Sequence, residues 1–168
     1  MAMTSAGVIA VLDALARDGI RVAVAGGWAI DALLGRETRE HDDLDLAVDS
    51  GLVKQAIRSL DRVGLEVSMD QLPARLELRG NGMVVDFHPV TFASDGVGHQ
   101  PGLAGEVYAY PVGSIDAVGS IGGREVTCLT PALLVRFHDG YEPRDVDRID
   151  MALLAEAFDL SLPARYRS

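Results

Sequence analysis

The chain has 168 residues and a formal net charge of −10, and 48% of its residues are hydrophobic while 24% are charged. This length and composition indicate one ordinary globular domain. The acidic charge disfavours a nucleic-acid partner, because phosphate backbones are bound by basic surfaces. It either draws in a cationic small molecule or serves solubility alone. Since no apolar run is long enough to cross a bilayer and no leader segment precedes the first helix, we expect a cytoplasmic protein without a membrane partner.

The first predicted elements are a helix and a short buried strand. Apolar residues at helical spacing over residues 5–18 indicate a helix that ends at Gly19. The apolar run 20–25 is short enough for a buried strand, and it leads directly into Gly26 and Gly27. Because glycine has no side chain, this pair lets the backbone turn sharply and approach a ligand closely.

A second helix is predicted over residues 28–34, with Gly35 as its C-terminal stop. Its first backbone N–H groups follow directly after Gly26 and Gly27, and free N–H groups at a helix start suit an anionic phosphate. The pattern therefore predicts a phosphate cradle, although a glycine pair alone is most often only a tight connection.

Acidic residues follow this helix in a spacing that favours a metal site. On a strand that starts near residue 43, Asp43 and Asp45 project from one face, while Leu44 and Leu46 point into the core. Two adjacent carboxylates repel each other unless a cation lies between them. Oxygen ligands favour Mg²⁺, which shares its coordination shell with substrate phosphates. The spacing thus indicates phosphoryl or nucleotidyl transfer with one or two Mg²⁺ ions.

Asp86 is a third candidate acid, because it stands inside the apolar run 83–87, where an unpartnered carboxylate is expensive to bury. On a strand beside that of Asp43 and Asp45, it would complete a three-carboxylate site. The alternative is an aspartate on an edge strand that faces water. His88 lies two residues further along the same face and is a candidate supporting group.

The remaining predicted elements alternate between helices and strands. They are a helix over 52–63, a strand over 65–69, a hairpin of 75–78 and 83–88, a strand over 106–110, a hairpin of 115–121 and 124–128, and helices over 131–138 and 145–158. Residues 89–105 are rich in glycine, and we expect a long loop there that is either disordered or functional, in the latter case as a cover over the acceptor. We expect residues 1–128 to form the core and residues 129–168 to be a helical segment packed on it as a single compact unit.

The stretch 26–46, GGWAIDALLGRETREHDDLDL, resembles the signature of antibiotic nucleotidyltransferases in the DNA polymerase β-like superfamily. It is similar both to lincosamide nucleotidyltransferases and to aminoglycoside 2''-nucleotidyltransferases. The residues that carry this resemblance are Gly26, Gly27, Trp28, Asp31, Leu34, Gly35, Thr38, Arg39, His41, Asp43 and Asp45. The resemblance implies an α/β (α+β) fold with a small mixed β-sheet, flanking helices and a short C-terminal helical segment. It also implies a homodimer.

Seven residues are the candidates for nucleotide binding. They are Gly26, Gly27, Trp28, Arg39, His41, Tyr141 and Arg148. Arg39 would clamp the triphosphate by paired hydrogen bonds. Residues 138–141 resemble a segment of lincosamide enzymes, where Tyr141 would stack on a base or sugar; packing at a helix end is an equal alternative. Arg148 would meet the triphosphate from the first turn of the last helix, as would Arg144, or both pair with neighbouring acids instead.

The predicted activity is transfer of a nucleoside monophosphate from a nucleoside triphosphate, expected to be ATP, to a hydroxyl of an aminated antibiotic. By family resemblance, Asp43, Asp45 and Asp86 hold the metal, and Asp86 accepts the hydroxyl proton as pyrophosphate leaves. The alternative is a non-catalytic nucleotide-binding or toxin–antitoxin regulatory module on the same fold, although the presence of all three acids favours an enzyme. Residues 138–141 favour a lincosamide, whereas the acidic net charge favours an aminoglycoside, so the sequence leaves the acceptor open. It also leaves the preferred nucleotide open.

Overall fold

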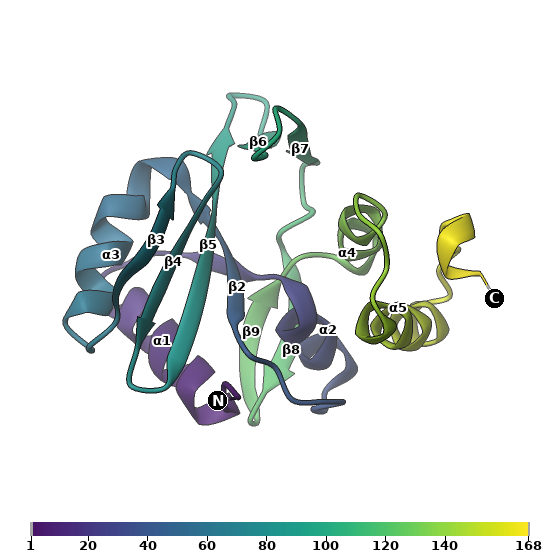
Figure 1. The fold of residues 1–168 in the computed structure, drawn as a ribbon, viewed down its shortest axis with the longest axis horizontal. Helices are drawn as coiled ribbons and strands as arrows, with labels where there is room; N and C mark the ends of the chain where they lie inside the picture. Colours follow the sequence, from purple (N-terminus) through teal and green to yellow (C-terminus); the bar gives the residue numbers. More distant parts are fainter. Residues whose placement is uncertain (1, 168) are drawn as a thin grey trace.

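The computed structural model describes residues 2–167 and shows a mixed β-sheet with helices packed against it (Figure 1). The helices are α1 (Ser5–Arg17), α2 (Gly26–Leu34), α3 (Val53–Asp61), α4 (Pro131–His138) and α5 (Asp145–Phe158), with short 3-10 helices η1 (Ser50–Leu52) and η2 (Ala164–Tyr166). The strands are β1 (Val22–Val24), β2 (Leu44–Asp49), β3 (Glu66–Gln71), β4 (Arg75–Gly80), β5 (Met83–Phe92), β6 (Gly98–Pro101), β7 (Val107–Tyr110), β8 (Ala117–Ile121) and β9 (Arg124–Cys128). This α+β architecture with a C-terminal helical segment confirms the predicted fold class.

The strand order of the central sheet is β3-β4-β5-β2-β1-β9-β8, and β6 and β7 form a hairpin that continues from the end of β5 (Figure 1). β2 runs parallel to β5 and β1 runs parallel to β9, whereas the other neighbouring pairs are antiparallel. Helices α1, α2 and α3 cover one face of the sheet: Gly7 of α1 lies against Met83 of β5, α3 packs beside α1, and α2 packs against β2, β8 and β9. None of the helices in residues 2–167 is long and apolar enough to cross a lipid bilayer.

Local sequence signals account for the helix ends. The side chain of Thr4 accepts a hydrogen bond from the backbone N–H of Gly7 and so caps α1, and Thr130 caps α4 in the same way. Gly35 ends α2 with φ 68°, a left-handed conformation that glycine adopts without steric cost. These ends agree with the predicted helix boundaries.

The structure corrects two of the predicted segments. Residues 89–105 are not one long loop, because β5 continues to Phe92 and β6 occupies Gly98–Pro101. These strands are stabilised by pairing with other strands: Thr91 at the end of β5 pairs with His99 of β6, and β6 pairs with β7. Helix α2 begins at Gly26 rather than at residue 28, so both glycines belong to its first turn.

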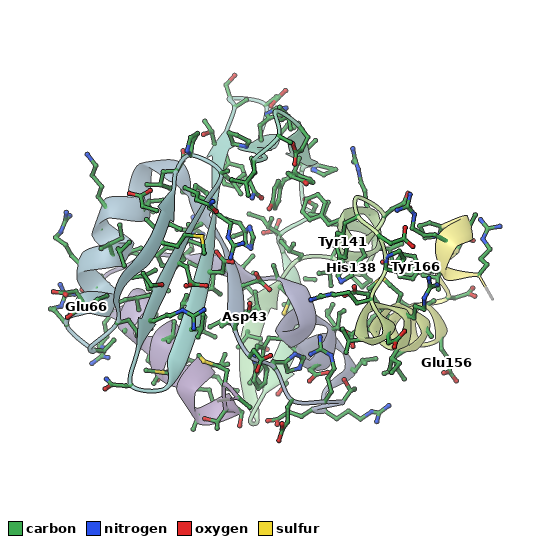
Figure 2. The ribbon with its side chains drawn as sticks, viewed as in Figure 1. Asp43, Glu66, His138, Tyr141, Glu156 and Tyr166 are labelled. Atoms are coloured by element: carbon green, nitrogen blue, oxygen red, sulfur yellow. The ribbon has the colours of Figure 1, made fainter. Side chains whose placement is uncertain are left out.

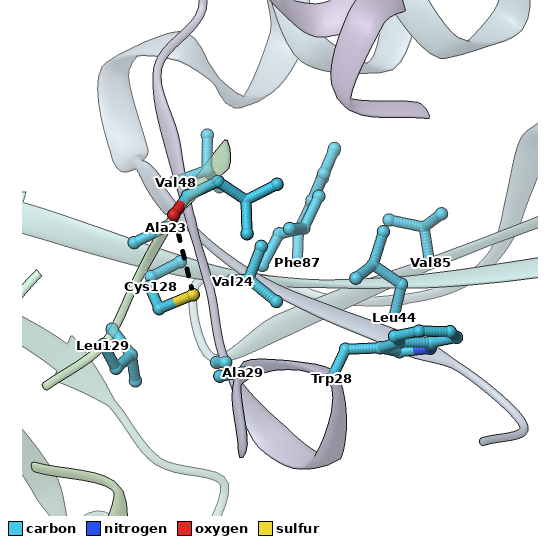
Figure 3. Close-up of a cluster of buried hydrophobic side chains, with 14 of the residues drawn as sticks. Ala23, Val24, Trp28, Ala29, Leu44, Val48, Val85, Phe87, Cys128 and Leu129 are labelled. Carbon is cyan, nitrogen blue, oxygen red and sulfur yellow. Dashed lines mark hydrogen bonds between the residues drawn. The ribbon is translucent and has the colours of Figure 1, made fainter. Parts of the chain in front are cut away.

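The hydrophobic core follows from strand alternation on β2 and β5. Leu44, Leu46, Val85 and Phe87 are all fully buried, as residues of one strand face are when helices cover that face. Figure 3 shows three of them, Leu44, Val85 and Phe87, in a buried cluster with Trp28 of α2. The intervening positions of both strands therefore project from the opposite face of the sheet.

The C-terminal helices are joined to the rest of the chain through α2. Helices α4 and α5 both pack on α2, and Arg39, in the segment after α2, donates hydrogen bonds to the carboxylate of Asp150 on α5. Asp150 is only 1% exposed, and a buried carboxylate is stable only when it is paired. We propose from this contact that residues 1–128 and 129–168 unfold as one cooperative unit.

Replacing Asp150 tests this proposal. We expect Asp150→Asn to lower the free energy of unfolding by roughly 2–3 kcal/mol, because loss of one partner leaves the guanidinium of Arg39 without its counter-charge. Thermal unfolding should be followed both by far-ultraviolet circular dichroism and by fluorescence of Trp28, the single tryptophan. The two signals should change together in the parent protein and together, at lower temperature, in the variant.

Glu156→Gln is the matched control, since Glu156 is an exposed acid on the same helix (Figure 2), and it should unfold like the parent protein. Two separate unfolding transitions in the parent protein would contradict the proposal that the chain unfolds as one cooperative unit.

Candidate active site

Two carboxylates lie side by side on the open face of the sheet. Asp45 on β2 and Asp86 on β5 are direct partners in the parallel register. Their neighbours Leu44, Leu46 and Phe87 face the core, so alternation places both acids on the opposite face. Asp86 is 4% exposed, and it reaches this position from a strand that is distant from β2 in the sequence. The structure thus brings the acids together as the sequence predicts for a shared site.

Asp43 lines the same cleft as Asp45 and Asp86 (Figure 2). It precedes β2 and is exposed. Partial desolvation, followed by the charges of Asp45 and Asp42, raises the pKa of the Asp43 carboxyl. Within residues 2–167, one group of metal-ligating side chains has its ligand atoms within 4.8 Å of one another, and it consists of Asp45, Asp86 and His88. Asp43 is a neighbour of that group and not a member of it.

Each of the two paired acids has a basic partner. His88 Nε2 lies 2.8 Å from Asp45 Oδ1, and Arg75, the first residue of β4, forms an ion pair with Asp86 through two hydrogen bonds. Burial raises the pKa of Asp45, but the hydrogen bond and charge of His88 outweigh it, so the pKa lies below its ordinary value. Burial raises the pKa of Asp86, and this effect prevails over the opposing charges of His88 and Arg75. The two carboxyls therefore differ in proton affinity, as expected where one of them is to accept a proton.

His88 itself is pulled in two directions. Burial lowers the pKa of its imidazole. The hydrogen bond to Asp45 and the charges of Asp45 and Asp86 raise this pKa by a larger amount, so the net shift is upward. Its second ring nitrogen, Nδ1, lies 3.1 Å from Nε2 of Gln100, a residue of β6 that is 7% exposed.

The start of α2 borders these acids. Its N-cap residue, Ala25, offers no side-chain hydrogen bond to the first turn, which leaves backbone N–H groups free for an anion. Gly26 has φ 58°, and a Cβ there would collide with the Asp45 carboxylate. A Cβ on Gly27 would lie 2.5 Å from His41 Nδ1 and 2.6 Å from Arg39 Nη2. Both glycines are therefore required by close packing against residues of the cleft.

Arg39 and His41 lie beside this helix start and are each held by a buried aspartate. Arg39 Nη2 is 2.7 Å from Asp150 Oδ2, and His41 Nε2 is 2.6 Å from Asp31 Oδ2. Both residues line the cleft. Trp28, in contrast, is 2% exposed and stacks on the His41 ring at 4.7 Å, away from the cleft lining. The guanidinium of Arg39, the imidazole of His41 and the positive end of the helix dipole make this corner suitable for a phosphate.

The C-terminal helices form the wall opposite the sheet. Tyr141 lines the cleft, and its hydroxyl donates to Asp147 Oδ1 at 3.2 Å; Figure 2 shows it close to His138. Arg148 is not part of the lining, since its guanidinium donates to the carbonyl of Arg165 at 2.6 Å. Arg144 lines the cleft in its place and is held by Asp147.

Sequence reasoning assigned no role to Arg75 or Gln100, and it gave His88 only a supporting place. The period of two between Asp86 and His88 was the available signal for His88. Arg75 begins β4 two residues before Glu77, the register partner of Asp86, and no local pattern shows such a cross-strand neighbour.

The cleft has a volume of about 850 Å³ and combines acidic, basic and apolar walls. Acids on its rim include Glu40, Asp42 and Glu106, and apolar side chains include Leu103, Tyr108 and Phe137. This size suits one or two small molecules. Carboxylates beside an uncapped helix start are the groups needed to bind a metal-bound polyphosphate.

Comparison with known proteins agrees with this geometry. A family model described as aminoglycoside-2''-adenylyltransferase matches residues 7–154. A lincosamide resistance protein from Staphylococcus haemolyticus is 28% identical over 127 residues, which cover 75% of this chain and 78% of the relative. A 2''-aminoglycoside nucleotidyltransferase from Escherichia coli is 34% identical over 107 residues, which cover 62% of this chain and 55% of the relative. The match thus spans about half the length of the aminoglycoside enzyme.

Two solved structures share the fold over most of the chain. The lincosamide antibiotic adenylyltransferase LnuA, with lincomycin bound, has a TM-score of 0.81 and 25% identity, covering 92% of this chain and 98% of that one. ANT(2'')-Ia in complex with adenylyl-2''-tobramycin has a TM-score of 0.73 and 26% identity, covering 91% of this chain and 88% of that one. From the extent of the family match, this chain belongs to the aminoglycoside-2''-adenylyltransferase family and is an antibiotic nucleotidyltransferase.

Proposed function

We propose that the protein transfers a nucleoside monophosphate from a nucleoside triphosphate, ATP first among them, to a hydroxyl of a lincosamide antibiotic, with Mg²⁺ as cofactor and pyrophosphate as the second product. The observation that carries the proposal is the register pair of Asp45 and Asp86 beside the uncapped start of α2. It supports a metal seat and a phosphate cradle within one cleft.

The donor set fits Mg²⁺. Asp43, Asp45 and Asp86 would hold the ion through carboxylate oxygens, the ligands that hard divalent cations prefer. The raised pKa values of Asp43 and Asp86 reflect burial together with acidic neighbours, and a cation would relieve that destabilisation. The bound ion would neutralise charge on the triphosphate and on the leaving pyrophosphate.

The chain's own residues bind the nucleotide and move the proton. The N–H groups at Gly26 and Gly27 donate to phosphate oxygens, and Arg39 and Arg144, each fixed by a buried aspartate, add positive charge at the cleft. Asp86 accepts the proton of the acceptor hydroxyl. The hydroxyl oxygen then forms a bond to the α-phosphorus, and the bond from that phosphorus to pyrophosphate breaks.

The cleft favours an acceptor with one amine and apolar groups. Leu103 lines the cleft and is 62% exposed, so it offers an apolar contact to a ligand bound there. The rim acids would receive the amine. LnuA, which has the higher TM-score of the two solved structures, is bound to lincomycin, and ANT(2'')-Ia is bound to an adenylylated tobramycin. We therefore place lincosamides first and aminoglycosides second.

The acceptor is tested with a panel of lincosamides and aminoglycosides. Incubation with each nucleoside triphosphate and Mg²⁺ should produce a nucleotide-sized mass gain on a lincosamide. Leu103→Asn should raise KM for that lincosamide about tenfold, the effect of losing one apolar contact, and leave KM for the triphosphate unchanged. Val112→Asn is the control, because Val112 is 67% exposed and is not part of the cleft lining. If tobramycin is modified and no lincosamide is, the proposal that lincosamides are the preferred acceptors would be refuted.

Asp86→Asn tests the assignment of the proton acceptor. At saturating Mg²⁺ and triphosphate we expect kcat to fall about 10²–10⁴-fold, the usual worth of a general base, while KM for the antibiotic changes little. Asp61→Asn, an exposed acid on α3, should behave like the parent protein. A kcat within a few-fold of the parent value in a folded Asp86→Asn variant would disprove the role.

Asp43→Asn and metal removal test the cofactor. We expect the variant to lose nearly all transfer, yet to keep or slightly raise its melting temperature, because removal of one carboxylate relieves repulsion from Asp42 and Asp45. Protein treated with a chelator should be inactive and should regain activity with added Mg²⁺. Full activity after chelation would rule out the metal requirement.

A further inference from the structure

A buried hydrogen-bond chain runs from the hairpin of β6 and β7 to the acids of the cleft. The hydroxyl of Tyr110 donates to Gln100 Oε1 at 2.6 Å, and Gln100 Nε2 lies 3.1 Å from the carbonyl oxygen of Ala74 and 3.1 Å from His88 Nδ1. His88 Nε2 then lies 2.8 Å from Asp45 Oδ1. Tyr110 and Gln100 are 2% and 7% exposed, so water does not substitute for these partners.

The carbonyl of Ala74 fixes the direction of every bond in this chain. A backbone carbonyl only accepts hydrogen bonds, so the atom of Gln100 that faces Ala74 must be the amide nitrogen. The second hydrogen of that nitrogen points to His88 Nδ1, which must therefore accept it. The ring proton of His88 is consequently on Nε2, and that N–H donates to Asp45 Oδ1.

The opposite tautomer of His88 would leave buried donors facing each other. A proton on Nδ1 would point at the amide N–H of Gln100, and turning the amide over would instead set Oε1 against the carbonyl oxygen of Ala74. Each arrangement leaves buried polar atoms unpaired, which is unfavourable by roughly 1–3 kcal/mol per group.

From this we infer that Gln100, supported by Tyr110, is a positioning residue that keeps His88 as an Nε2–H donor to Asp45, and that the divalent metal is held by carboxylates and not by His88. The second part rests on the proposed function. Asp45, Asp86 and His88 lie close enough to share one ion, but a nitrogen that carries a proton has no lone pair for a metal. The bond from His88 occupies Oδ1 of Asp45 and leaves Oδ2, which faces Gly26, for the ion. Partners of this kind orient a ligand and tune its affinity for the metal.

The test begins with the metal-free protein, so it does not depend on finding the acceptor. The ring nitrogens of His88 are observed by long-range ¹H–¹⁵N correlation in ¹⁵N-histidine-labelled protein, with His88→Asn used to assign the signals among the four histidines. At a pH above the raised pKa of this imidazole, where the ring is neutral, we expect the Nε2–H tautomer. In Gln100→Leu we expect this preference to be lost, whereas Gln55→Leu, which removes an amide hydrogen bond to Asp18 far from the cleft, should leave the His88 signals unchanged. A proton on Nδ1 in the parent protein would overturn the assignment.

Addition of Mg²⁺ tests the ligand set. The Nε2 proton of His88 should persist when the metal saturates, and its loss would show that His88 is a ligand and overturn the second part. In the transfer assay, Gln100→Leu should raise the Mg²⁺ concentration that gives half-maximal activity about tenfold or more. The KM for the antibiotic should stay unchanged. An unchanged Mg²⁺ requirement would show that Gln100 does not act through Asp45. Absence of transfer in the parent protein, with the Nε2–H tautomer present, would refute the proposed function and leave the hydrogen-bond assignment standing.

Discussion

The parallel pairing of β2 with β5 is the constraint on which the rest of the structure depends. It sets Asp45 directly beside Asp86, and two carboxylates at that spacing repel each other unless positive partners surround them. Arg75 reaches Asp86 from β4, His88 reaches Asp45 from β5, and the positive end of α2 starts next to Asp45. Each surrounding element therefore contributes part of the counter-charge, and the same arrangement leaves carboxylate oxygens available to a metal ion.

A second layer of charge ties the nucleotide side of the cleft to the C-terminal helices. Arg39 and Arg144 line the cleft, and each is held by a nearly fully buried aspartate of α5, Asp150 and Asp147. Buried ion pairs add little net stability when compared with apolar packing, but removing one partner is strongly unfavourable. These pairs fix the guanidinium groups in position before a phosphate arrives, so less ordering is required on binding. The contacts that attach α5 to the core thus also organise the site.

The hairpin of β6 and β7 connects the side of the cleft proposed for the antibiotic to the proposed metal site. Leu103 and Glu106 in its turn form part of the rim, while Gln100 and Tyr110 in its strands reach back to His88. By our proposals, one small element would therefore both shape the place for an antibiotic and, through His88, orient Asp45. This arrangement explains why so short a hairpin carries two buried polar side chains, each of them hydrogen-bonded.

Local signals in the sequence determined the helices with their caps, the glycine pair and the three candidate acids, because capping, turn formation and the period of two are properties of neighbouring residues. They did not determine that residues 98–101 form a strand, since its partners β5 and β7 are tertiary. Nor did they show that Arg75 pairs with Asp86, that Gln100 reaches His88, or that Arg144 rather than Arg148 faces the cleft. Those contacts join residues from separate strands and helices, and only the register of the sheet and the packing of α5 on α2 decide them.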